Sequence, residues 1–184
     1  GALGAAVARV AKLRRVHWHL VLALLALILA RPSLRATVVG GAVVAAGLML
    51  RAWAAGFLEK GGGLCRDGPY RYLRHPLYLG SFVSAVGFCA MANVVWGWVM
   101  VLPLFAILYG VQVSLEERFL RARYSEEYAR YAARVPMVIP RFAGGAGESR
   151  AWRLERALLN REHWHVLMAL ALAGLFFIKW RWGQ

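Results

Sequence analysis

Five long apolar blocks with almost no charged residues restrict the fold of this sequence more than any other feature. A helix needs about 20 apolar residues to cross the hydrocarbon layer of a membrane, and each block approaches that length. Of the 184 residues, 60% are hydrophobic and 17% are charged, which is more apolar than is usual for a soluble domain. The blocks cover approximately 17–30, 36–58, 77–95, 96–113 and 164–180. We therefore predict an all-α polytopic membrane helix bundle of about five transmembrane helices, forming a single integral membrane domain over 1–184.

The distribution of positive charge predicts the orientation of this bundle. Arginine and lysine concentrate before the first block, between the second and third, and between the fourth and fifth, whereas the opposite loops carry few. Because positively charged loops stay in the cytoplasm, we expect a cytoplasmic N-terminus, in a bacterial inner membrane or the endoplasmic reticulum. The net charge of +14 fits contact with anionic headgroups, and the sequence shows no nucleic-acid-binding module. We expect membrane lipids as partners, and no nucleic acid.

The largest polar region, 114–162, separates the fourth and fifth blocks. Charges and aromatic residues at helical spacing predict a helix over 118–134 that continues the fourth span or lies on the membrane surface. Val135-Pro136 and Ile139-Pro140 then predict extended backbone, because a residue before proline avoids the helical conformation. A glycine-rich link, 142–147, and a second amphipathic helix, 149–160, follow.

Spans three and four are separated by so few residues, 93–98, that they must form a tight helical hairpin. Their cytoplasmic ends are therefore neighbours, which places Arg74-His75-Pro76 beside Glu116-Glu117. Paired glutamates at a membrane boundary need cationic or hydrogen-bonding partners. The candidates are Arg74, His75, Arg118 and Arg134. Either an ion-pair lattice fastens the loops, or the groups line a polar cavity; the convergence of donors, carboxylates and tyrosines favours the cavity.

Three motifs in this region resemble a known family. They are Arg74-His75-Pro76-Leu77-Tyr78-Leu79-Gly80, Glu116-Glu117-Arg118-Phe119-Leu120, and Arg134-Val135-Pro136 with Ile139-Pro140. Their order and spacing resemble the integral membrane methyltransferases of the isoprenylcysteine carboxyl methyltransferase and phospholipid methyltransferase group, and the last motif is more similar to the first branch. The segment 47–54 resembles the upstream helix of that branch. The resemblance covers 47–142, the expected methyltransferase-like core, and leaves 149–184 as an amphipathic helix plus an extra C-terminal span.

The resemblance implies transfer of a methyl group from S-adenosylmethionine to a lipophilic carboxylate, thiol or amine at the cytoplasmic membrane face. The cofactor-binding residues that it implies are Arg74, His75, Pro76, Tyr78, Leu79, Gly80, Glu116, Tyr128 and Tyr131. The catalytic candidates are Glu117, Arg134 and Arg141, and the substrate-binding candidates are Arg51 and Trp53. Arg51 is expected either to meet an anionic group, from the substrate or a loop glutamate, or to extend to the membrane surface.

The chemistry of the cofactor agrees with these residue types. Its carboxylate needs a cation or ring N–H, as in Arg74, His75 or Arg134, and its ribose needs a carboxylate acceptor such as Glu116 or Glu117. Its adenine needs an aromatic or apolar wall, which Tyr78, Leu79 and Tyr128 offer. Gly80 permits close approach of a ligand or of a helix backbone. An amine acceptor would also need a base, and Glu117 or His75 is suited to that role.

Several alternatives remain open at this stage. A sterol-reductase-like NADPH-dependent reductase and a non-catalytic transporter or assembly protein are the other functional hypotheses. The segments His17-Trp18-His19 and His163-Trp164-His165 are expected to be interfacial anchors, because the two rings of His-x-His lie on opposite helix faces, although four histidines together would suit a metal. We predict no metal site.

Cys65 is either a thiol nucleophile or, as we favour, an incidental cysteine. The methyl acceptor and oligomeric state are left undetermined, as is the effect of Met137 where the family commonly has a basic residue.

Overall fold

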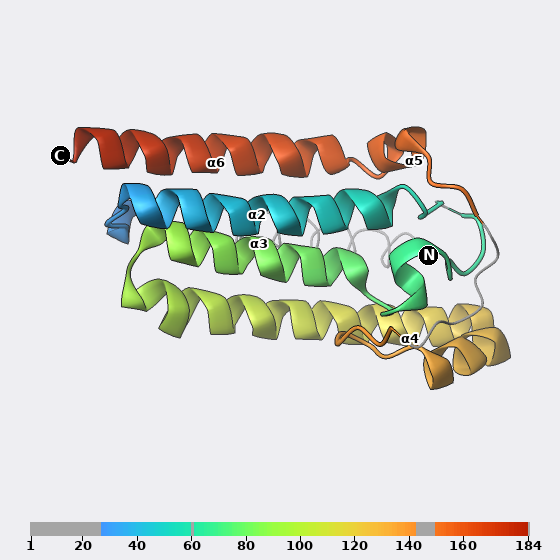
Figure 1. The fold of residues 1–184 in the computed structure, drawn as a ribbon. Coiled ribbons are helices and arrows are strands. Elements are labelled where there is room, and N and C mark those ends of the chain that lie inside the picture. The colour runs from blue at the N-terminus through green and yellow to red at the C-terminus, as the bar shows by residue number, and fades with distance from the viewer. Residues whose placement is uncertain (1–26, 60, 143–149, 184) are drawn as a thin grey trace, which may run out of the picture.

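A computed structural model describes residues 27–59, 61–142 and 150–183. Within these ranges the regular secondary structure is entirely helical, which confirms the predicted all-α class. The long helices are α2 (Leu34–Ala55), α3 (Pro76–Ala92), α4 (Leu102–Arg134) and α6 (Glu162–Trp182). They lie side by side in the order α6, α2, α3, α4 (Figure 1). The short elements are η1 (Gly68–Arg71), the π-helical turn η2 (Gly97–Val101) and α5 (Leu154–Leu159).

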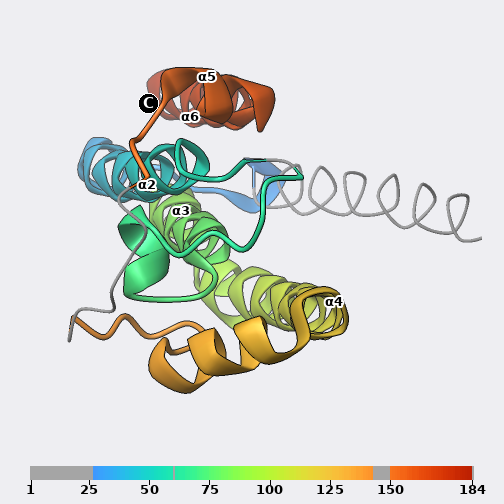
Figure 2. The same ribbon diagram turned by 90° about the vertical axis from the view of Figure 1, so that its right-hand side faces the viewer.

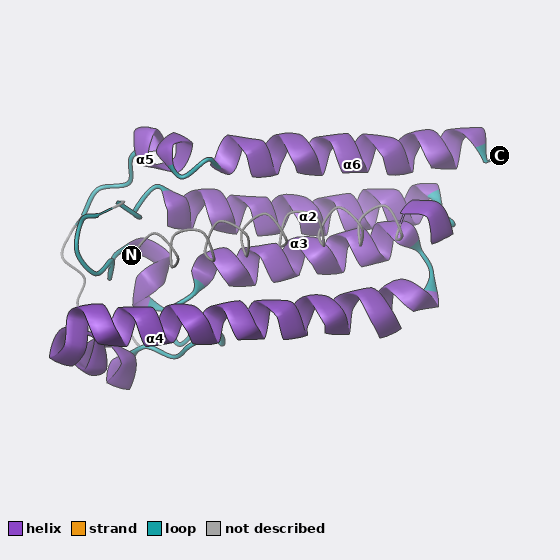
Figure 3. Ribbon diagram, turned by 180° about the vertical axis from the view of Figure 1, so that it is seen from behind, coloured by secondary structure: helices purple, strands orange, loops and turns teal. Residues whose placement is uncertain are grey.

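Several of these helices are suited to crossing a membrane. The segments Leu34–Ala55, Gly97–Arg134 and Glu162–Trp182 are long and apolar enough to span a bilayer, and the 17 residues of α3 form a shorter apolar helix between α2 and α4 (Figure 3). The second to fifth predicted blocks therefore each correspond to a helix of a membrane bundle. The first block lies largely outside the described residues, so the number of spans stays a prediction.

The predicted tight hairpin between α3 and α4 is confirmed. Asn93 ends α3 in the left-handed conformation, with φ 52°, and its N–H donates to the carbonyls of Cys89 and Ala90. Asparagine tolerates this conformation better than most residues. The chain resumes a helical path within a few residues, and the two helices return side by side. The two helix ends that were predicted to be neighbours are thereby brought together.

Glycines allow α2 and α3 to pack with their backbones almost in contact. A Cβ atom on Gly47 would lie 2.5 Å from the carbonyl oxygen of Gly80, and one on Gly87 would lie 2.7 Å from that of Gly40. Both distances are too short for real carbon atoms. Small residues at such crossings are typical of membrane helix pairs. The close approach expected at Gly80 is therefore made by a helix backbone.

The last turns of α4 change direction at Ser125. This residue has φ 38° and ψ −111°, which is not helical, and the segment beyond it runs at an angle to the rest of α4 (Figure 2). The helix predicted over 118–134 was expected either to continue the fourth span or to lie on the membrane surface. In the structure it continues the fourth span and folds back beyond Ser125. It ends at Arg134, and the extended conformation of the next residue, Val135, confirms the expectation for a residue before proline. The following irregular segment is fastened by hydrogen bonds from the Arg74 N–H to the Pro136 carbonyl (2.9 Å) and from the Arg141 N–H to the Tyr72 carbonyl (3.0 Å).

The amphipathic helix predicted over 149–160 is shorter in the structure. Residues 150–153 are not helical, and α5 covers Leu154–Leu159. The cause is docking onto the end of α2: the Trp152 indole donates to Ala52 and the Arg153 N–H donates to Gly56. Arg153, the residue before α5, is accordingly in the extended conformation, with φ −135° and ψ 128°. The predicted glycine-rich link lies almost wholly outside the described residues.

A buried ion pair fastens α6 to the rest of the bundle. The Arg51 guanidinium forms a bidentate contact with Glu162, from Nε at 3.0 Å and from Nη2 at 2.8 Å, and both side chains are buried. Its Nη1 donates to the Leu77 carbonyl at 3.1 Å and to the Ser81 hydroxyl. Arg51 of α2 therefore joins α3 and α6, and of its predicted alternatives the structure shows pairing with a glutamate, here Glu162.

We expect Arg51→Met to destabilise the protein by about 3–5 kcal/mol, because the Glu162 carboxylate would stay buried without its partner. The double variant Arg51→Met/Glu162→Leu should regain most of that loss, since replacing both ions by apolar residues is often neutral. Thermal unfolding of the two single variants and the double variant in detergent measures this. A double variant as unstable as Arg51→Met would contradict the explanation.

Candidate active site

The centre of the site is Glu117, a buried residue of α4 that faces the start of α3. Its Oε2 lies 2.5 Å from Nη1 of Arg74, and its Oε1 lies 2.8 Å from Nε2 of His75. Pro76 is the first residue of α3, where its missing N–H costs nothing, and this start holds Arg74 and His75 at the helix end. The proximity predicted from the short hairpin is confirmed. Both predicted partners, Arg74 and His75, contact the Glu117 carboxylate.

The fold-back of α4 adds a third partner to Glu117. The Tyr128 hydroxyl, fully buried, donates to Oε1 of Glu117 and lies 3.4 Å from Nη1 of Arg74. Arg121 contacts Oε2 at 3.6 Å. The sequence prediction missed Arg121, although its i,i+4 spacing from Glu117 was a usable signal. The other predicted partners, Arg118 and Arg134, are exposed, and the structure pairs neither with Glu117.

The two glutamates differ in what they can still bind. Both oxygens of Glu117 already accept from buried donors, so this carboxylate holds Arg74, His75 and Tyr128 in place. Glu116 is 40% exposed at its side chain and lies 3.9 Å from Nδ1 of His75. A carboxylate in that position has room to accept hydrogen bonds from a ligand. Of the predicted pair, Glu116 is the better placed for binding.

Aromatic rings continue from this cluster along the faces of α3 and α4. The His75 and Tyr78 ring centroids are 5.8 Å apart, and Tyr78 meets Tyr109 edge-on at 5.4 Å. Tyr109 stacks on Phe105 at 4.0 Å. Leu79 is partly buried in the same turn of α3. Tyr78 and Leu79, two residues of the predicted aromatic and apolar wall, therefore lie close to His75, and Tyr109, which the sequence prediction did not include, lies next to Tyr78.

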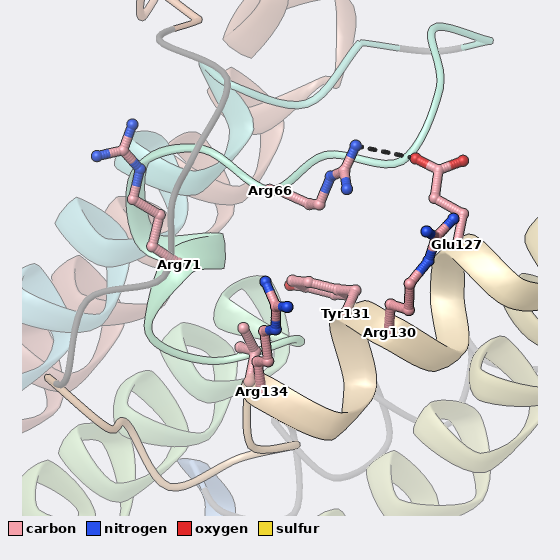
Figure 4. A pocket seen from close by; sticks show the side chains of 7 residues that line it. Arg66, Arg71, Glu127, Arg130, Tyr131 and Arg134 are labelled. Atoms are coloured by element: carbon pink, nitrogen blue, oxygen red, sulfur yellow. Dashed lines mark ion pairs between the residues drawn. The ribbon is translucent and has the colours of Figure 1, made fainter.

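A second feature is a basic cavity of about 490 Å³ between the loop before α3 and the folded-back end of α4. Figure 4 shows Arg66, Arg130, Tyr131 and Arg134 around one space, with the Arg71 side chain at its edge extending away from the others. It is lined by Arg66, Arg71, Glu127, Arg130, Tyr131, Arg134 and Val135. Two predicted site residues, Tyr131 and Arg134, belong to this cavity, whereas Arg74, His75 and both glutamates of the first cluster do not line it. The groups predicted to line one polar cavity are therefore separated: Arg74 and His75 form ion pairs with Glu117, as in the predicted lattice alternative, and this cavity lies beside them.

The remaining candidates lie apart from both features. Trp53 is 43% exposed on α2, close in sequence to the Arg51 ion pair. Arg141 is exposed in the segment after α4, where its backbone N–H is bonded to Tyr72. Within the described residues no group of three or more histidine, cysteine or acidic side chains is placed to hold a metal ion. His17 and His19 of the four-histidine hypothesis lie outside those residues.

Cys65 is buried, and its thiol donates to the Phe57 carbonyl at 3.4 Å. Burial raises the pKa of this thiol. A hydrogen bond with the backbone of Asp67 lowers the pKa by less, so the net pKa is above the usual value. The thiol therefore stays protonated at neutral pH, and a thiolate forms only at higher pH than usual. We expect maleimide labelling of Cys65, in a Cys89→Ala background, to be slow at pH 7 and to rise only in strongly alkaline buffer. Rapid labelling at pH 7, followed by mass spectrometry, would restore the nucleophile hypothesis.

The apolar helices and the buried polar cluster at their end define an integral membrane protein with an enzyme-like site. The chain belongs to the phospholipid methyltransferase family, whose model matches residues 35–127. That region contains α2, α3, the glutamates and Arg74-His75. It overlaps the predicted core of 47–142, starting earlier and ending before Tyr131.

Some curated relatives are named methyltransferases, which agrees with this membership, and others are named metal-resistance proteins. The chain is similar to the cobalt-zinc-cadmium resistance protein of Cupriavidus metallidurans, at 34% identity over 113 residues, 60% of this chain and 51% of the relative. It is also similar to methanethiol S-methyltransferase 1 of Bradyrhizobium diazoefficiens (37% over 71 residues, 39% and 24%). A third relative is protein-S-isoprenylcysteine O-methyltransferase of Schizosaccharomyces pombe (33% over 78 residues, 42% and 33%). The chain thus spans about half the length of the first relative and a third or less of the others. No solved structure matches it significantly.

Proposed function

We propose that this protein transfers a methyl group from S-adenosylmethionine to a lipophilic acceptor at the cytoplasmic face of a membrane. One observation carries the proposal: Arg74, His75 and Tyr128 converge on the buried Glu117 beside the partly exposed Glu116. All but Tyr128 lie within the matched family region. Two relatives that are named methyltransferases support the reaction class.

The residues around Glu116 fit the cofactor by their chemistry. Glu116 is the free carboxylate for the ribose hydroxyls, and the Tyr78 and Tyr109 rings supply an aromatic wall. Aromatic faces and carboxylates also attract the positive charge of a sulfonium. The cofactor, when bound, supplies an electrophilic methyl group. In this proposal Pro76 and Leu79 support the wall, and Gly80 lets α3 sit against α2.

The role of Glu117 in this proposal is positioning. Its oxygens are occupied by three buried donors, so the carboxylate fixes the orientation of His75 and Arg74. Preorganised groups of this kind favour transfer by holding reactants in place and excluding water. A thiolate or carboxylate acceptor needs no further base. For an amine acceptor, His75 is the group that we propose to take the proton, because both oxygens of Glu117 already accept hydrogen bonds.

The acceptor is proposed to be lipophilic because the site lies at the end of membrane-spanning helices. The relatives' names mention methanethiol S-methylation and isoprenylcysteine O-methylation, so transfer to sulfur and transfer to oxygen are both represented. The name of the metal-resistance relative describes no reaction. Because basic residues concentrate at the same end of the chain's helices as the site, we place that end in the cytoplasm.

Calorimetric titration of the purified, detergent-solubilised chain with S-adenosylhomocysteine tests the proposal, with NADPH as a parallel ligand. Saturable binding of S-adenosylhomocysteine alone, in the micromolar range, is the expected result. Binding of NADPH instead would favour the reductase hypothesis. Absence of both, in a sample shown to be folded by circular dichroism, would favour a non-catalytic membrane protein.

A further inference from the structure

The basic cavity beside the proposed active site has an excess of positive charge. Four arginines and one glutamate line it. Arg66 pairs with Glu127 at 3.0 Å, and Arg71 contacts Asp67 at 3.3 Å. Arg130 and Arg134 are exposed, and the described part of the chain gives neither an acidic partner. Arginines from two segments thus line one cavity, and their mutual repulsion is unfavourable unless an anion lies between them.

The hydrogen-bond donors of these arginines favour a phosphate group as that anion. A guanidinium presents its N–H donors in a planar fork that matches two oxygens of a phosphate, and it is the preferred residue for this contact. Here the forks come from opposite sides: Arg66 and Arg71 from the loop before α3, and Arg130 and Arg134 from the end of α4. The buried Nε of Arg71 also has no hydrogen-bond partner among the described residues.

The neighbouring segment indicates that the phosphate belongs to a lipid. Directly after the cavity residue Val135, three apolar side chains are turned outward: Val138 is 44% exposed, Ile139 81% and Phe142 80%. Backbone hydrogen bonds from Arg74 to Pro136 and from Arg141 to Tyr72 hold this segment against the loop. An apolar surface fixed beside a cluster of arginines is typical of contact with acyl chains and anionic headgroups.

We propose that the basic cavity binds the phosphate of an anionic membrane lipid, whose acyl chains lie along residues 137–142. The lipid is not a reactant at this site, since Glu116 and His75 do not line the cavity. Its role is to seat the folded-back end of α4 on the membrane surface, and with it Tyr128 of the Glu117 cluster. This goes beyond the proposed function and does not depend on the identity of the methyl acceptor.

Native mass spectrometry of the full chain in neutral detergent tests the proposal, with phosphatidylglycerol and phosphatidylcholine of identical acyl chains as probes. Arg130→Gln/Arg134→Gln removes the two cavity arginines without ion-pair partners. Arg118→Gln/Arg123→Gln, exposed residues of the same helix, removes equal charge outside the cavity. We expect the wild type to prefer phosphatidylglycerol, the cavity variant to bind it at least about tenfold more weakly, and the control variant to stay within about twofold.

Three results would overturn the proposal. Equal losses in both variants would reduce the effect to general surface charge. Competition by millimolar inorganic phosphate, with no preference between the two lipids, would assign the cavity to a soluble phosphate. Displacement of phosphatidylglycerol by S-adenosylhomocysteine would assign it to the cofactor carboxylate. If S-adenosylhomocysteine fails to bind at all, the methyltransferase proposal fails, while the lipid measurement remains decisive by itself.

Discussion

Gly47→Leu is expected to abolish folding of the helix bundle. The first side-chain carbon would already lie 2.5 Å from the Gly80 carbonyl oxygen and 2.3 Å from the Ser84 hydroxyl oxygen. Neither obstacle can move far, since the first is backbone and the second is buried. Accommodating leucine would require α2 and α3 to separate along their whole contact. The expected cost exceeds about 5 kcal/mol, the lower end of the stability of a natural domain.

Gly41→Leu is the matched control, because a Cβ at Gly41 of the same helix has no atom within 4 Å. Both variants add the same apolar side chain to α2, so membrane insertion is affected equally. Size-exclusion chromatography and thermal unfolding in detergent compare them. We expect Gly41→Leu to behave as the wild type and Gly47→Leu to aggregate or to be degraded. A well-folded Gly47→Leu protein would show that α2 and α3 are not in tight contact.

Some parts of this structure followed from local features of the sequence. The long uncharged blocks specify helices because backbone polar groups must be satisfied inside the lipid layer. The short segment after α3 leaves room for a turn alone, and Asn93 makes it. From those two facts alone, the contact of Arg74 and His75 with Glu117 could be predicted.

Other parts depended on contacts between distant segments. Glu162 was not predicted as the partner of Arg51, because 111 residues separate them and the sequence does not state which face of α6 packs on α2. The position of Tyr128 depends on the backbone change at Ser125, where neither glycine nor proline gives a signal. The same change places Arg134 in the basic cavity, away from Glu117. The contacts of Arg74 and His75 with Glu117 could therefore be predicted from the sequence, whereas the positions of Glu162, Tyr128 and Arg134 could not.

The consecutive glutamates should respond in opposite ways to the same substitution. Glu117→Gln removes a charge that faces Arg74, whose side chain is 10% exposed, and His75, at 3%. Breaking such a buried pair costs about 3–5 kcal/mol, so we expect a large drop in the unfolding temperature and, with it, loss of methyl transfer. Glu116→Gln changes a partly exposed side chain, and we expect the unfolding temperature to stay near that of the wild type.

Binding of S-adenosylhomocysteine separates the two roles. A hydrogen bond to a charged group contributes about 1.5–3 kcal/mol, so Glu116→Gln should weaken binding by about 10-fold to 100-fold in a protein that remains folded. Calorimetry and thermal unfolding on the same samples give both values. Normal binding by a stable Glu116→Gln protein would remove Glu116 from the cofactor site. A Glu117→Gln protein as stable as the wild type would contradict the positioning role, because removal of a buried, paired carboxylate should lower the unfolding temperature. It would mean instead that the Glu117 carboxylate is available to a ligand.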